Sequence, residues 1–99
     1  MSNPKIDEYG NKTWYNENGY RHRLDGPAVE YHDGSKFWYV NGKRHRLDGP
    51  ACECHDGTKF WFVNGKEVSG PLDLLEHGAN LIDITPYLTA REIVCLIQK

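Results

Sequence analysis

The chain has 99 residues, of which 12 are Lys or Arg and 14 are Asp or Glu, so its formal net charge is −2 with neutral histidines. This length predicts one domain, 1–99, with a modest core, and the balanced charge gives no electrostatic footprint for a nucleic-acid-binding protein. Because the chain has no run of eighteen apolar residues, we expect neither a membrane span nor a signal peptide. Three cysteines, an odd number, argue against a disulfide framework and favour a cytoplasmic protein.

A phrase of about 23 residues repeats along the chain. Arg-His-Arg-Leu-Asp-Gly-Pro-Ala occurs unchanged at 21–28 and 44–51, and His-Asp-Gly-(Ser/Thr)-Lys-Phe-Trp follows each time. A partial copy begins at Trp14, where Trp-Tyr precedes Asn-Gly by one residue more than at Trp38, which suggests a one-residue bulge. A third copy decays after Lys66. Repetition at this period predicts a repeat array of two and a half to three copies over 12–70, followed by a different segment over 71–99.

Asp-Gly and Asn-Gly dipeptides separate the short runs of β-forming residues, and such dipeptides favour two-residue hairpin turns. They lie at 18–19, 33–34, 41–42, 56–57 and 64–65. The pattern therefore predicts a mainly β protein, in which consecutive hairpins form a meander in a single twisted sheet. Leu-Asp-Gly-Pro at 24–27 and 47–50 joins one hairpin to the next.

If every turn has two residues, Glu30 lies opposite Phe37 and Tyr39 lies opposite Arg44. Each repeat then has one face of Trp, Val and His and another of Arg, Phe, Tyr and Glu. We expect the Trp face to form the core. A turn of three to five residues would change these pairings.

The C-terminal segment predicts short helices instead of strands. Pro71 to His77 reads as a helix closed by Gly78, and Thr89 with Glu92 forms a capping box ahead of a second helix. The apolar stripe of that second helix consists of Ala90, Ile93, Val94 and Ile97. These helices either cap the open end of the array or form a docking or dimerisation surface, so a homodimer through the C-terminal helix is one expectation.

Arginines and aromatic residues that recur in each repeat are the candidate partner-binding residues. A guanidinium group over an aromatic ring suits carboxylate or phosphate ligands. Alternatively, Glu30 and Glu53 neutralise the arginines in a ladder that serves folding alone. The candidate residues are Arg21, Arg23, Arg44, Arg46, Phe37, Tyr39, Phe60 and Phe62.

Cys52, Cys54 and His55 bring soft metal ligands together in sequence. In the first repeat, however, Val29 and Tyr31 take the places of the two cysteines, as expected for packing positions. We therefore expect no metal, no cofactor and no catalytic residue, since no orienting group or Gly-rich oxyanion turn accompanies these side chains. An enzyme is the weakest of the functional hypotheses.

The string from the Tyr-Val-Asn-Gly-Lys at Tyr39 through the repeated Arg-His-Arg-Leu-Asp-Gly-Pro-Ala and His-Asp-Gly-(Ser/Thr)-Lys-Phe-Trp resembles the membrane occupation and recognition nexus (MORN) repeat, in the variant found in bacterial and phage proteins. Residues 12–66 carry the resemblance. The chain departs from the common repeat, since it has His-Arg-Leu-Asp-Gly-Pro where that repeat has His-Gly, and its C-terminal helices have no counterpart in the motif.

The resemblance implies β-hairpin repeats that act as a binding scaffold, with antitoxin roles in some bacterial relatives. We thus predict a non-enzymatic module that binds and regulates or inhibits another protein, in the host cytoplasm if a phage encodes it. The alternative is a binder of a phosphate-bearing ligand or lipid headgroup through the same arginines.

Overall fold

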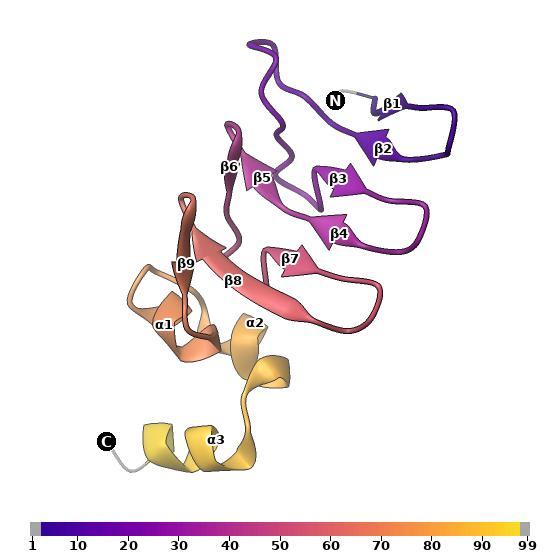
Figure 1. Ribbon diagram of the computed structural model, residues 1–99. Coiled ribbons are helices and arrows are strands. Elements are labelled where there is room, and N and C mark those ends of the chain that lie inside the picture. The colour runs from indigo at the N-terminus through magenta and orange to yellow at the C-terminus, as the bar shows by residue number, and fades with distance from the viewer. Residues whose placement is uncertain (1–2, 98–99) are drawn as a thin grey trace.

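The computed structural model describes residues 3–97, without the side chain of Ile97, and consists of short strands followed by short helices (Figure 1). The strands are β1 (Lys5–Ile6), β2 (Lys12–Thr13), β3 (Val29–Glu30), β4 (Lys36–Phe37), β5 (Tyr39–Val40), β6 (Lys43–Arg44), β7 (Cys52–Glu53), β8 (Lys59–Val63) and β9 (Lys66–Val68). The helices are α1 (Pro71–Leu75), α2 (Leu81–Ile84), the 3-10 turn η1 (Thr85–Tyr87) and α3 (Ala90–Ile97).

Seven of the strands form one antiparallel sheet in the order β1-β2-β3-β4-β7-β8-β9, and β5 pairs with β6 in a separate small sheet. The sheet is not closed, and the molecule is elongated, with extents of 50 × 28 × 21 Å. Figure 1 shows the hairpins stacked in chain order, with the helices after the last one. The predicted mainly β meander with short C-terminal helices is confirmed, but β5 and β6 lie outside the single sheet that the sequence predicted. None of the helices within residues 3–97 has the length and apolar character needed to cross a bilayer.

The turns at Asp33-Gly34 and Asp56-Gly57 contain three residues, one more than we predicted. The Tyr31 amide donates to the Ser35 carbonyl at 2.9 Å, which leaves 32–34 as the loop. Gly34 has φ 96°, and the Asp33 side chain accepts from the Ser35 amide at 2.9 Å. This is a three-residue loop that ends in a left-handed glycine, and the turn at Gly57 repeats it.

The extra loop residue shifts the strand register by one. Glu30 lies opposite Lys36, and Val29 lies opposite Phe37, so the predicted pairing of Glu30 with Phe37 is wrong. A one-residue shift moves side chains to the other face of a sheet. The glutamates therefore lie on the face that we call the tryptophan face, whose residues are Trp14, Trp38, Trp61, Val40, Val63, Arg23, Arg46, Glu30 and Glu53. The opposite face, the phenylalanine face, carries Arg21, Val29, Phe37, Tyr39, Arg44, Cys52, Phe60 and Phe62.

The Asn-Gly turns of the second and third hairpins have the predicted two residues. Asn41 and Gly42 both have positive φ, 51° and 82°, as the mirror-image hairpin turn requires. Tyr39 consequently lies opposite Arg44, as predicted.

The N-terminal part differs from the expectation in two ways. In the hairpin at Asn18-Gly19, the Asn16 amide donates to the Tyr20 carbonyl at 2.8 Å, so the extra residue expected as a strand bulge lies in a three-residue turn. In addition, β1 and β2 form a hairpin that we did not predict, closed by a turn in which Gly10 has φ 87°. Its loop reads Glu-Tyr-Gly and therefore lacks the dipeptide signal.

Histidine side chains connect each hairpin to the turn of the next. The Asn41 amide donates to Nδ1 of His22, and the Asn64 amide donates to Nδ1 of His45, both at 3.0 Å. Both bonds need an unprotonated Nδ1. The repeats are thus coupled through neutral imidazoles.

The apolar core lies where α1 and α2 cover the third hairpin. Val63, Leu74 and Ile84 are buried, and the partly buried residues that pack around them are Leu47, Trp61, Val68, Leu75, Ala79 and Leu88. Helix α1 ends at Leu75, two residues before the predicted end at His77, and a turn in which Gly78 has φ 97° follows it. The predicted capping box at Thr89 is present. Helix α2 was not predicted, although its N-cap has a clear sequence signal in Asn80, whose side chain accepts from the Ile82 amide at 3.0 Å.

The bond between His45 and Asn64 predicts a loss of stability in mild acid. Burial, and next the positive charge of His77, lower the pKa of His45 in the folded protein. A lowered folded pKa means that this contribution is complete above the ordinary histidine pKa of about 6.5 and is lost as the pH falls towards the folded value.

We expect the urea midpoint to fall between about pH 8 and about pH 5. His45→Asn, which keeps an acceptor at the δ position and does not titrate, should reduce that fall. His55→Asn, at an exposed turn position, is the control and should keep the full fall. An unchanged pH dependence in His45→Asn would contradict the assignment.

Candidate functional site

A row of alternating guanidinium groups and aromatic rings crosses the phenylalanine face. Arg21 of the first hairpin has its Cζ 5.5 Å from the ring centre of Tyr39 in the second. Arg44 of the second hairpin lies 5.2 Å from the ring of Phe62 in the third and 5.9 Å from that of Phe37. Each arginine thus contacts a ring of the following hairpin. We call the five residues Arg21, Phe37, Tyr39, Arg44 and Phe62 the arginine–aromatic ladder.

The ladder is accessible to a partner. Arg21 and Arg44 are both exposed, and neither forms an ion pair with any residue in the described range 3–97. Nε of Arg44 donates to the Tyr39 hydroxyl at 3.4 Å, which leaves its terminal nitrogens available. Phe60, beside the ladder, is 40% exposed.

Tyr31 belongs to the same surface and was not among the predicted residues. Its ring is 41% exposed and meets that of Phe37 edge to face at 5.4 Å. Because Tyr31 lies two residues after Val29, the two side chains share one face of the strand. The predicted two-residue turns placed that face in the core, so Tyr31 was interpreted as a core residue.

Two of the predicted binding residues, Arg23 and Arg46, lie on the tryptophan face. Arg46 pairs with Asp48 at 2.7 Å and Glu53 at 2.9 Å, donates to the Pro50 carbonyl at 3.0 Å, and lies 3.8 Å above the Trp38 ring. Arg23 makes the equivalent contacts one repeat earlier. Arg23 and Arg46 therefore form their ion pairs with carboxylates of the protein itself. This matches the alternative interpretation of the sequence, in which Glu30 and Glu53 neutralise arginines and serve folding.

The stack of tryptophans and arginines ends where the helices begin. Ser69 occupies the position equivalent to Arg46 in the third copy, so Trp61 has no arginine from the repeat. Instead, Tyr87 of η1 meets Trp61 edge to face at 5.4 Å. A residue of the helical segment thus replaces the missing arginine.

The cysteines and histidines do not come together. Burial raises the pKa of the Cys52 thiol, so this residue favours the protonated form. Within the described part of the chain, no group of three His, Cys, Asp or Glu side chains lies close enough to hold a metal ion. Cys95 is exposed on α3, because that helix extends from the body of the protein.

Searches of family models, curated proteins and solved structures found no match to this chain.

The contrast between Arg46 and Arg44, two residues apart, gives a stability test. Arg46→Met removes two ion pairs and a hydrogen bond and leaves Glu53 partly buried without its cation, so we expect the free energy of unfolding to fall by about 2–4 kcal/mol. Arg44→Met removes mainly exposed cation–π contacts and should lower it by about 0.5–1 kcal/mol. Urea unfolding followed by tryptophan fluorescence measures both. Equal losses would contradict the different roles that we assign.

Proposed function

We propose that this chain is a non-enzymatic interaction module that binds another protein on its phenylalanine face. The observation that carries the proposal is the arginine–aromatic ladder, in which exposed arginines lie over partly exposed aromatic rings across three hairpins. Protein interfaces are enriched in arginine and aromatic residues, and these dominate their binding energy. The ladder offers this composition on strands that the rest of the fold already holds in place.

The arrangement favours a protein over a small phosphate-bearing ligand. A phosphate site gathers several donors around one anion, whereas Arg21 and Arg44 come from successive repeats and each lies over a different ring. Glu67, opposite Phe62 in the sheet, adds a carboxylate to the same face. An extended surface that mixes charges and rings suits a protein partner.

We propose in addition that the chain is a MORN-like repeat protein and that it regulates or inhibits the protein it binds, in the cytoplasm. The hairpin repeats support a scaffold of this type, and the ladder supports the binding of a protein partner. Fold likeness alone assigns no partner.

The experiment is affinity capture from cells of the protein's own setting, followed by mass spectrometry. Tyr39→Ala/Arg44→Glu removes one ring and reverses one charge of the ladder, and we expect recovery of the partner to fall at least tenfold, as for residues worth about 2 kcal/mol or more. Tyr9→Ala/Lys66→Glu makes the same chemical changes at exposed positions outside the ladder and should leave recovery unchanged.

Circular dichroism and thermal unfolding must first show that both variants fold. Undiminished capture by folded Tyr39→Ala/Arg44→Glu would rule out this face as the binding site. Thermal stabilisation by inositol hexakisphosphate that the same variant abolishes would instead support the phosphate-binding alternative.

A further inference from the structure

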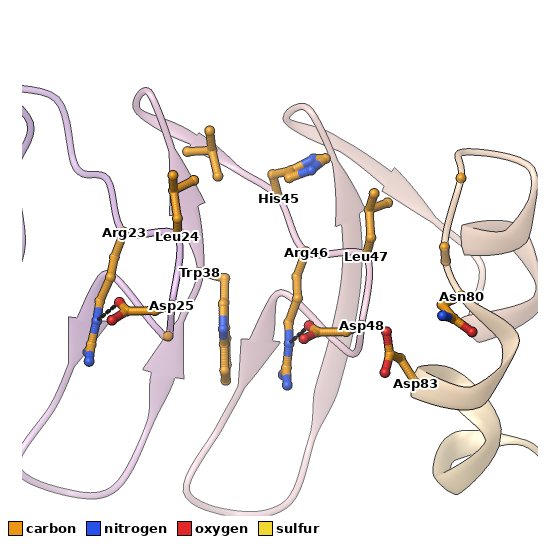
Figure 2. Close-up of a pocket in the computed structure, with 14 residues that line it drawn as sticks. Arg23, Leu24, Asp25, Trp38, His45, Arg46, Leu47, Asp48, Asn80 and Asp83 are labelled. Carbon is orange, nitrogen blue, oxygen red and sulfur yellow. Dashed lines mark hydrogen bonds and ion pairs between the residues drawn. The ribbon is translucent and has the colours of Figure 1, made fainter.

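An open groove of about 580 Å³ lies on the tryptophan face, opposite the ladder (Figure 2). One wall is the first joint between repeats, with Leu24 and Asp25, and the other is the segment from Gly78 to Asn80 with Asp83 of α2. Trp38 and Val40 lie between these walls. The groove is therefore built from two repeats and the helical segment together.

One repeat further along the chain, the protein fills the equivalent space with its own helices. Leu47 and Val63 are the counterparts of Leu24 and Val40, 23 residues later. They pack with Leu74 of α1 and Ile84 of α2, which are both fully buried.

At the first joint no part of the described chain provides that cover. Leu24 remains 80% exposed, although its counterpart Leu47 is partly buried. The cover at Leu47 indicates what would fit the open joint at Leu24: a short peptide segment that presents Leu or Ile side chains.

The groove is also negatively charged. Asp25 and Asp48 have side chains 73% and 62% exposed, and Asp83 is exposed as well. Asp25 and Asp48 form ion pairs with Arg23 and Arg46, but each arginine also pairs with Glu30 or Glu53, so each joint has two carboxylates for one guanidinium group and keeps a net negative charge. Figure 2 shows Asp25, Asp48 and Asp83 one after another across the groove, from the first joint to α2.

We propose that this groove binds a short segment of a partner protein that combines apolar and basic side chains. A Leu or Ile would lie against Leu24, Trp38 and Val40, as Leu74 and Ile84 lie against the next repeat. Lys or Arg side chains would meet Asp25, Asp48 and Asp83.

The charge distribution disfavours the alternative that a second copy fills the groove. The chain itself has a net charge of −2, and on α3 Glu92 follows Arg91 directly. The groove lies on the face opposite the ladder, so this proposal does not depend on the proposed function. The two can fail separately.

The test is a titration of the isotope-labelled protein with three synthetic peptides, followed by amide resonances. The first peptide carries Leu and Lys at helical spacing, the second has Glu for Lys, and the third has Ser for Leu. We expect only the first to bind, with shifts at Leu24, Asp25 and Asp83 and none at Tyr39 or Phe60.

Variants decide whether the groove is the site. Leu24 and Asp83 are both exposed, so Leu24→Ser and Asp83→Lys, alone and combined, should leave the fold intact while the double variant weakens binding of the first peptide about tenfold or more. Glu8→Lys, the same charge reversal in the N-terminal turn, controls for general attraction and should bind within about twofold of wild type.

Several results would overturn the proposal. These are equal binding by wild type and the double variant, binding of the Glu peptide as strong as that of the Lys peptide, or no binding of the first peptide. Sedimentation that shows self-association removed by Leu24→Ser would assign the groove to a second copy.

Discussion

The guanidinium group of Arg46 connects β4, the joint at 47–50 and β7, which share few other side-chain interactions. It stacks on Trp38 next to β4, binds Asp48 and the Pro50 carbonyl in the joint, and reaches Glu53 in β7. Strands of two residues bury little apolar surface, so a sheet built from them needs another source of order. A planar cation with five donors provides it, because one side chain satisfies several acceptors while its face covers a ring.

This dependence explains how the array ends. Each tryptophan needs a side chain over its ring, and the repeat provides arginine for Trp14 and Trp38 but Ser69 in the third copy. The helical segment then supplies Tyr87 for Trp61 and buries Leu74 and Ile84 against the last hairpin. Helices α1 and α2 and the turn η1 therefore continue the packing of the stack with different residues, as capping units of repeat proteins do.

The sequence predicted the hairpins of the repeats, the two-residue Asn-Gly turns at 41–42 and 64–65 and the capped α3, because these depend on local backbone requirements of a few residues. It did not predict the register across Asp33-Gly34, because a two-residue and a three-residue loop are both compatible with that dipeptide. The choice moves Glu30 from beside Phe37 to the face of Trp38 and Arg46, and with it the candidate site changes. Whether an arginine is exposed or forms ion pairs within the fold depends on such long-range neighbours. The phrase Arg-His-Arg alone therefore could not show that Arg44 is exposed whereas Arg46 is ion-paired.

Repetition of sequence does not give repetition of surface. Leu24 and Leu47 stand in identical phrases, yet one is 80% exposed and the other is covered by the helical segment. The helices cover the joint at Leu47 and leave the preceding joint at Leu24 open, so the same position becomes an accessible apolar surface beside three carboxylates. On the opposite face the hairpins continue without such a cover, and Arg21 and Arg44 remain exposed over their rings. The two faces of the sheet therefore present different surfaces, one with exposed carboxylates around an apolar groove and one with exposed arginines over aromatic rings.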